Sequence, residues 1–294
     1  MSSIHHFHPT GVEKCNALMN LIHVVQMGIL NMSPDSFSDG GLHSTLAKAV
    51  AHAQSLVAQG AHIIDVGGVS TRPGSRELSE IEELERVIPV LRELRQVLPQ
   101  NILISLDTSS PEVARCAASD QLIDLINDVF AARKIAESQV RKFTTAHIAA
   151  EFKLGLILMH MQGTPETMQD KPQYSDCAED VCDFLKKRVE FAKSCGVDWL
   201  AVDPGIGFGK TLEHNLSLLS LDGMTQLGSL NLPILIGLSR KSLLKAFAER
   251  NGNLPNFDNP ASELQWRDEQ SKLWEKSCIL WGARMIRTHV VTLS

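Results

Sequence analysis

Short apolar runs alternate with longer stretches of helical periodicity along the chain. Eight runs rich in β-branched residues predict strands, at residues 24–30, 62–66, 102–106, 122–126, 154–159, 199–202, 233–238 and 283–288. Between them, helix formers with apolar residues three and four positions apart predict helices, at 44–59, 79–98, 135–152, 176–194, 241–250 and 262–281. Pro111 and Thr211 are typical helix-start residues and predict two more helices, after the third and sixth strands.

This alternation predicts an α/β fold with a parallel sheet, because parallel neighbours need crossover connections. An open, doubly wound sheet is the alternative. Eight strands in 294 residues favour a closed (β/α)₈ TIM barrel, which commonly uses about 250 residues. We therefore expect a single domain over residues 1–294, with 1–20 as an N-terminal extension. Since no helical stretch follows the eighth strand before Ser294, we expect the barrel to lack its final helix.

Every predicted strand ends in polar residues. In chain order they are Asn31; Asp65; Asp107; Asn127 with Asp128; His160; Asp203; Ser239, Arg240 and Lys241; and Arg287 with His289. One such residue alone could equally be a helix cap or a turn former. Eight ends out of eight favour an enzyme over a scaffold protein, because TIM barrels build their sites at the C-terminal ends of the strands.

The last two strands are expected to end in a cationic cluster. Arg287 and His289 are two residues apart, so their side chains share one face of a strand. Arg240 and Lys241 follow the preceding strand. The loops after strands seven and eight are the usual phosphate site of this architecture, so the cluster predicts an anion there.

Composition narrows the partners and the compartment. The formal net charge is −6 and no Lys/Arg-rich block is present, which argues against nucleic acid as a partner. No apolar run approaches the ~20 residues that span a bilayer, and the N-terminus lacks a signal-peptide pattern. None of the six cysteines forms a Cys-x-x-Cys pair, so we expect reduced thiols and a cytoplasmic protein that does not contact membranes.

The stretch 203–211 ends in Gly-Lys-Thr, like a nucleotide-binding P-loop. That motif needs a glycine five positions before its second glycine, and this sequence has Pro204 there. We expect the glycines of the stretch to let the backbone pass close to a flat ligand, with Phe208 stacking on it or covering it. No Gly-x-Gly-x-x-Gly follows any predicted strand, so a dinucleotide-binding fold has no support.

Seven segments, in the same order, resemble the dihydropteroate synthase family of pterin-binding barrels. They are residues 28–41, 65–74, 107–109, 126–128, 158–163, 203–210 and 239–242, and the resemblance runs from about residue 26 to 289. It implies a transferase of folate biosynthesis that joins 6-hydroxymethyl-7,8-dihydropterin diphosphate to p-aminobenzoate and releases diphosphate. It further implies Mg²⁺ as a cofactor, sensitivity to sulfonamides and a homodimer.

The resemblance also implies roles for individual residues. Expected substrate-binding residues are Asp107, Asn127, Met159, Asp203, Phe208, Gly237 and Lys241 on the pterin side, together with Phe37, Asp39, Pro73 and Ser242, of which Phe37, Pro73 and Ser242 match the p-aminobenzoate pocket. Expected catalytic residues are Asn31, Thr71, Arg72, Lys241, Arg287 and His289, with Asn31 also at the magnesium position.

Two positions depart from the family's usual pattern and keep alternatives open. Val69 stands where the second loop usually has glutamate, and Val290 where the eighth strand is usually followed by aspartate. A catalytically weak or inactive pterin-binding paralogue is therefore the main alternative. A methyltransferase acting on a methylated folate is another, although the first two loops and the Arg287/His289 pair argue against it.

Overall fold

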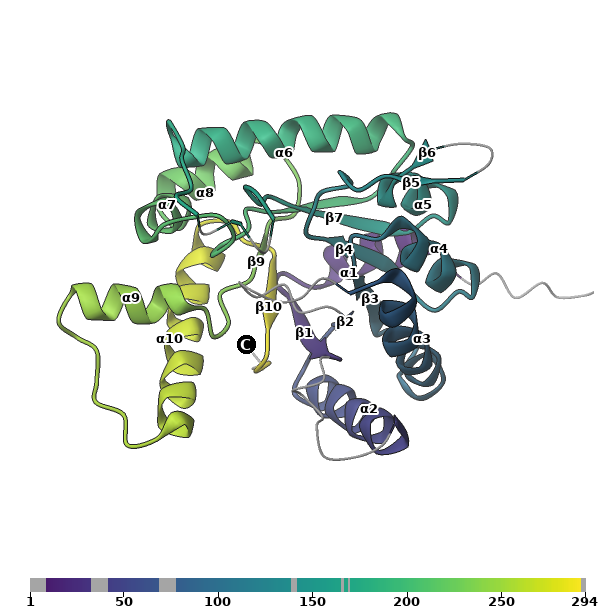
Figure 1. The fold of residues 1–294 in the computed structure, drawn as a ribbon, viewed down its shortest axis with the longest axis horizontal. Helices are drawn as coiled ribbons and strands as arrows, with labels where there is room; N and C mark the ends of the chain where they lie inside the picture. Colours follow the sequence, from purple (N-terminus) through teal and green to yellow (C-terminus); the bar gives the residue numbers. More distant parts are fainter. Residues whose placement is uncertain are drawn as a thin grey trace, which may run out of the picture.

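The computed structural model describes residues 9–32, 42–68, 78–138, 142–164, 167–168 and 170–291. Its centre is a ring of parallel strands surrounded by helices (Figure 1). The ring consists of β1 (Val25–Asn31), β2 (Ile63–Gly67), β3 (Leu103–Asp107), β4 (Leu125–Asp128), β7 (Gly155–Met159), β8 (Leu200–Asp203), β9 (Leu235–Ile236) and β10 (Met285–Thr288).

The strands close into a barrel. Their order is β8-β7-β4-β3-β2-β1-β10-β9, and all neighbours pair in parallel. The two ends of this series meet through a bridge between Val202 and Ile234, where the Val202 N–H donates to the carbonyl of Pro233 at 3.0 Å. The predicted (β/α)₈ TIM barrel is confirmed, and the open sheet is excluded.

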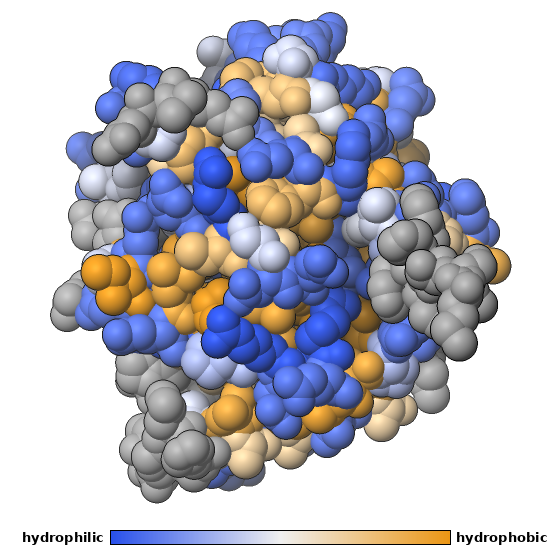
Figure 2. Space-filling model, turned by 90° about the vertical axis from the view of Figure 1, so that its right-hand side faces the viewer, coloured by the Kyte–Doolittle hydropathy of each residue, from blue (hydrophilic) through white to orange (hydrophobic). Residues whose placement is uncertain are grey.

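The helices are α1 (Gly11–Leu21), α2 (Leu42–Ala58), α3 (Glu80–Val97), α4 (Pro111–Ser119), α5 (Thr145–Glu151), α6 (Cys177–Ser194), α7 (Leu212–Leu218), α8 (Leu221–Gly228), α9 (Ser242–Arg250) and α10 (Pro260–Leu280). Most of them cover the outside of the barrel, where even-numbered strand residues such as Ile64, Leu106 and Ile286 join the main apolar core. On the face shown in Figure 2, hydrophilic residues cover most of the surface, with hydrophobic ones between them.

Odd-numbered strand residues point into the barrel, because successive side chains of a strand alternate between its faces. At the N-terminal end they form an apolar plug that includes Met27, Ile63, Leu103 and Leu235. Cys15 of α1 belongs to the same cluster, so this helix closes the bottom of the barrel. From the sequence, residues 1–20 are expected only as an extension. The capping box of α1, in which Thr10 and Glu13 satisfy each other's backbone N–H groups, was the overlooked signal.

The predicted helix over residues 135–152 is wrong. The chain forms a small antiparallel pair, β5 (Ala136–Glu137) with β6 (Lys142–Phe143), and α5 covers only the last part of the stretch. The cause is Asp128, whose carboxylate accepts from the backbone N–H groups of Phe130 and Ala132 and from the hydroxyl of Thr145. These bonds impose a turn after β4 and start the helix at Thr145.

Three other expectations concern the end of the barrel, the thiols and the membrane. Ile286 on the outward face of β10 is 1% exposed and belongs to the same apolar core as Cys278 of α10. In the described part of the chain, which ends at residue 291, no helix follows β10. All six cysteines carry free thiols, as predicted. Among the described residues, no helix is both long enough and apolar enough to cross a membrane.

Candidate active site

The inward-facing residues change from apolar to polar at the C-terminal end of the barrel. Asn31, Gly67, Asp107 and Asn127 lie in register on four neighbouring strands and form one row at the mouth. Asp203 lies in register with Met159 further round the ring. The structure therefore brings together five of the predicted site residues from β1, β3, β4, β7 and β8.

An arginine and three polar side chains form a network in the centre of this mouth. Arg287 of β10 donates from Nε to Asp65 Oδ2 and from Nη2 to Asp107 Oδ2, both at 2.7 Å. Asp65 Oδ2 also accepts from Asn127 Nδ2 at 3.1 Å. Three of the five N–H donors of Arg287 make no hydrogen bond to any described residue. Among the described residues, nothing competes with a ligand in the mouth for these donors.

Burial changes the acidity of these groups. Asp107 is 8% exposed, and burial raises its pKa to about 7, while Arg287 opposes that rise and Asp65 adds to it. Burial also raises the pKa of Asp203, against the lowering effect of Lys241. Carboxylates whose pKa values are raised in this way at the mouth of a cleft are typical of functional sites.

Lys241 follows β9, the neighbour of β8 in the ring, and its charge interacts with that of Asp203. Burial lowers the pKa of Lys241 to about 8, and Asp203 counteracts part of that effect. Its ammonium donates to the carbonyl of Ile206 and lies 4.4 Å from the centre of the Phe208 ring. Lys241, at the start of α9, thus lies against the Phe208 ring of the loop that follows β8.

One wall of the mouth is apolar. Met159 clusters with Val129, Met161 and Met168, and Phe208 packs against them. After β9, a Cβ added to Gly237 would meet only Arg287 Cβ among the described residues, at 3.8 Å, so this position leaves space that a side chain would fill. An apolar wall beside a polar row suits a flat heterocycle with hydrogen-bonding edges.

Lys210 fixes the loop after β8. It is 3% exposed, and its Nζ lies 2.9 Å from Gly205 O, 3.0 Å from Phe208 O and 2.9 Å from His160 Nδ1. Asn215 Oδ1 accepts from the N–H of Gly207 at 2.7 Å. The loop is therefore held by hydrogen bonds to the backbone of Gly205, Gly207 and Phe208. From the sequence alone, Lys210 has no predicted role of its own, because the P-loop pattern fails there.

Whether a strand-end residue has an odd or an even number decides whether its side chain points into the mouth or away from it. Asp128, His160 and Arg240 have even numbers and turn away from the mouth to serve the surrounding loops and helices. Arg240 makes a bidentate ion pair with Asp268 of α10, at 2.8 and 3.0 Å. Its expected part in the cationic cluster is therefore wrong.

The other predicted residues occupy the rim or fall outside the described ranges. The Ser239 hydroxyl lies 3.0 Å from His289 Nδ1 and accepts from the His289 backbone N–H at 3.1 Å, which sets the orientation of the ring. Ser242 is the first residue of α9, and Val290 is half-buried. Six predicted positions lie outside the described residues, namely Phe37, Asp39, Val69, Thr71, Arg72 and Pro73.

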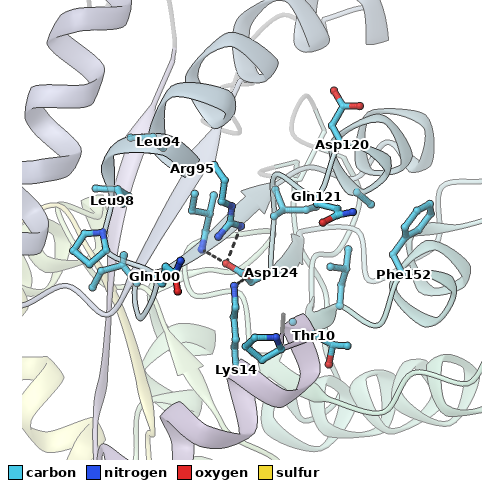
Figure 3. Close-up of a pocket in the computed structure, with 18 residues that line it drawn as sticks. Thr10, Lys14, Leu94, Arg95, Leu98, Gln100, Asp120, Gln121, Asp124 and Phe152 are labelled. Carbon is cyan, nitrogen blue, oxygen red and sulfur yellow. Dashed lines mark hydrogen bonds and ion pairs between the residues drawn. The ribbon is translucent and has the colours of Figure 1, made fainter. Parts of the chain in front are cut away.

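A cavity of about 650 Å³ lies at the opposite end of the barrel (Figure 3). At its centre Asp124 pairs with Lys14 at 2.8 Å and with Arg95 at 3.0 Å, and it also accepts from the backbone N–H of Ile104. This buried carboxylate ties α1 and α3 to the base of the barrel. The N-terminal end of a TIM barrel serves stability, so we place the candidate site at the polar mouth instead.

Comparisons with known proteins agree with this geometry. A family model described as pterin binding enzyme matches residues 27–289. The dihydropteroate synthase of Escherichia coli K12 is 45% identical over 275 residues, which cover 93% of this chain and 89% of the relative. The solved structure of the Xanthomonas albilineans dihydropteroate synthase with 4-aminobenzoic acid is 36% identical to this chain, with a TM-score of 0.75. The match covers 92% of this chain and 88% of the chain in that structure. The same enzyme in complex with 7,8-dihydropteroate is 34% identical over the same shares, with a TM-score of 0.73. The chain therefore belongs to the pterin-binding enzyme family and, within it, to the dihydropteroate synthases.

Proposed function

We propose that this chain condenses 6-hydroxymethyl-7,8-dihydropterin diphosphate with p-aminobenzoate to give 7,8-dihydropteroate and diphosphate. The observation that carries the proposal is the mouth itself, where Asp107, Asn127, Asp203 and Lys241 face an apolar wall of Met159 and Phe208. The related structures that contain 4-aminobenzoic acid and 7,8-dihydropteroate support the choice of substrates.

The polar row suits the edges of a pterin. The pyrimidine edge of a pterin offers paired N–H donors, which match the two oxygens of a carboxylate such as Asp107 or Asp203. Asn127 both donates and accepts, and Lys241 donates to an acceptor on the ring. Met159 and Phe208 cover the faces of the ring and exclude water. Loss of diphosphate leaves a cation delocalised into the pterin, and exclusion of water leaves the aniline nitrogen as the available nucleophile.

Arg287 and His289 are proposed to stabilise the departing anion. Arg287 keeps three N–H donors for it, and Ser239 holds the imidazole of His289 in place. Positive charge and hydrogen-bond donors directed at a leaving group lower the barrier because they act most strongly where negative charge develops. Arg287 also touches Asp65 and Asp107, so it links the anion half of the site to the pterin half.

Magnesium is the proposed cofactor, with Asn31 as its ligand from the protein. No group of three or more His, Cys, Asp or Glu residues that could hold a metal occurs in the described ranges. One amide oxygen fits Mg²⁺, which is often held mainly by substrate phosphates and water. Asn31 Oδ1 borders Gly67, where an added Cβ would lie 3.6 Å from it, so the glycine leaves room. The metal, when bound, neutralises charge on the leaving diphosphate.

The decisive experiment is a coupled diphosphate-release assay with purified protein. We expect release that requires both p-aminobenzoate and Mg²⁺, formation of 7,8-dihydropteroate, and competition by a sulfonamide with p-aminobenzoate. Folded protein that binds the pterin in calorimetry but releases no diphosphate would instead identify an inactive paralogue.

We also propose a homodimer that uses α10. Leu273 and Leu280 lie two turns apart on one face of this helix and are 56% and 83% exposed. Large apolar side chains exposed together mark an interaction surface. Analytical ultracentrifugation should find a dimer, and Leu273→Glu should shift it to monomer while Leu221→Glu on α8, at a residue 57% exposed, does not. A monomeric wild-type protein at micromolar concentration would contradict this assembly.

A further inference from the structure

Asp65 is the most buried charged group in the mouth, although neither the sequence patterns nor the site built above gave it a role of its own. Its side chain is 0% exposed. In register it lies between Ile29 of β1 and Ser105 of β3, one layer below the row that contains Asp107. A residue at this depth cannot reach a ligand in the mouth and acts only through its neighbours.

One oxygen of Asp65 joins two strands that are not its neighbours. Oδ2 accepts from Arg287 Nε of β10 at 2.7 Å and from Asn127 Nδ2 of β4 at 3.1 Å. Because a carboxylate only accepts, the amide of Asn127 must turn its nitrogen toward Asp65 and its oxygen away. The same bond fixes the plane of the Arg287 guanidinium. Asp65 thereby sets which atoms of both residues face the mouth.

The other oxygen of Asp65 shows that burial here has a cost. Oδ1 is buried and has no hydrogen-bond partner among the described residues, and neither has Ser105 Oγ, which lies on the register partner of Asp65. A buried polar atom without a partner destabilises a fold. An apolar residue at position 65 would avoid this cost, so the arrangement is better explained by the orientation of Arg287 and Asn127 than by stability.

We propose that Asp65 is a positioning residue for pterin binding, which holds the Arg287 guanidinium and the Asn127 amide in their ligand-binding orientations. The proposal rests on the proposed function. It assigns Asp65 no contact with either substrate and no proton transfer. Its effect is therefore confined to the pterin half of the reaction, and the p-aminobenzoate half should be nearly insensitive to it.

Asp65 also influences how pterin binding depends on pH. The charges that act on Asp107 are those of Arg287, Asp65, Glu83 of α3 and Asp128 of β4. Burial raises its pKa most, Arg287 opposes this, and the three carboxylates add to the rise. Removing the charge of Asp65 should therefore lower the pKa of Asp107 and extend pterin binding to more acidic solution. Loosening of the fold alone would not move the profile in that direction.

The test is Asp65→Asn with Ser105→Ala as the matched control from the same buried layer. For Asp65→Asn we expect the KM for the pterin diphosphate to rise at least about tenfold, because a charge-assisted hydrogen bond to Arg287 is lost. The KM for p-aminobenzoate should stay within about twofold, and the acid limb of the pterin kcat/KM profile should move to lower pH. Ser105→Ala should match the wild type in all three.

The remaining outcomes would contradict either the role of Asp65 or the proposed function. An unchanged pterin KM, or equal rises in both KM values with no movement of the acid limb, would overturn the proposal. If Asp65→Asn does not fold, Asp65→Ser removes volume instead of adding a second amide and carries the same expectations. Wild-type protein without p-aminobenzoate-dependent diphosphate release would refute the proposed function, whereas an active wild type with an indifferent Asp65→Asn would refute only this inference.

Discussion

Lys210→Met tests whether the loop after β8 is held by a buried amine. The wild-type Nζ lies within hydrogen-bond distance of Gly205 O, Phe208 O and His160 Nδ1. A charged ammonium donates to all three acceptors. A neutral amine donates to the two carbonyls and accepts from the imidazole, so both protonation states satisfy the same three contacts. Methionine keeps most of the stem but leaves all three groups unpaired.

The size of the effect depends on pH. Burial lowers the pKa of Lys210 from its ordinary value of 10.5 to about 7, with Cys177 and Asp203 opposing and Lys241 adding to the change. Between pH 7 and pH 10.5, Lys210 is protonated in the unfolded chain but largely neutral in the folded chain. This residue therefore makes the free energy of unfolding rise with pH over that range. The fall in pKa corresponds to about 5 kcal/mol in full, of which about 2 kcal/mol lies between pH 7 and pH 9.

The assay is urea unfolding of wild type and Lys210→Met at pH 7 and at pH 9. We expect the variant to lose about 2 kcal/mol more stability at pH 9 than at pH 7, because only at the higher pH is the wild-type amine buried without the cost of its charge. Lys241, whose pKa lies near 8 chiefly because of burial, is present in both proteins, so its burial contributes equally to both and only its coupling to Lys210 differs. Lys186→Met, at an exposed position of α6, should show no such difference. Equal losses by Lys210→Met at the two pH values would refute the reasoning.

Three further outcomes follow from the mouth. Lys241→Met should lower kcat/KM for the pterin substrate about 10- to 100-fold, since a hydrogen bond to a charged group is lost, while circular dichroism still shows a folded barrel; full activity would remove Lys241 from the site. Because a protonated Asp107 cannot accept two hydrogen bonds, pterin kcat/KM should fall as pH drops through about 7, and a profile flat from pH 8 to 6 would contradict this. Chelation by EDTA should abolish diphosphate release and added Mg²⁺ should restore it, whereas turnover that persists in EDTA would exclude the metal.

Much of the fold could be predicted from periodicity. All eight barrel strands were located because each is apolar on both faces, as a strand covered by helices outside and packed inside must be. The prediction of a helix over 135–152 is wrong because of one residue that precedes the stretch. Asp128 accepts hydrogen bonds from the backbone N–H groups of Phe130 and Ala132 and so turns the chain. Such side chain to backbone bonds compete with helix formation and leave no periodic signal.

The candidate site was only partly predictable. The residues of the polar row follow from the strand ends, but their partners depend on geometry across the barrel. Arg287 and Asp65 are 222 residues apart in the chain, and nothing in the spacing indicates that they meet. Lys210 was missed for another reason. It was judged only as part of a failed nucleotide motif, although its position in a glycine-rich loop also suits a residue that fixes that loop.

One physical rule divides the strand-end residues more sharply than residue type does. Side chains alternate along a strand, so the parity that places Met27, Ile63 and Leu103 in the barrel interior also assigns Asp107 and Arg287 to the mouth. Asp107 and Asp128 are both buried carboxylates at strand ends, yet only the first faces the interior. The opposite parity of Asp128 directs its charge to backbone N–H groups, where it shapes a loop. Parity counted from the apolar plug therefore separates binding residues from structural ones before any side-chain contact is known.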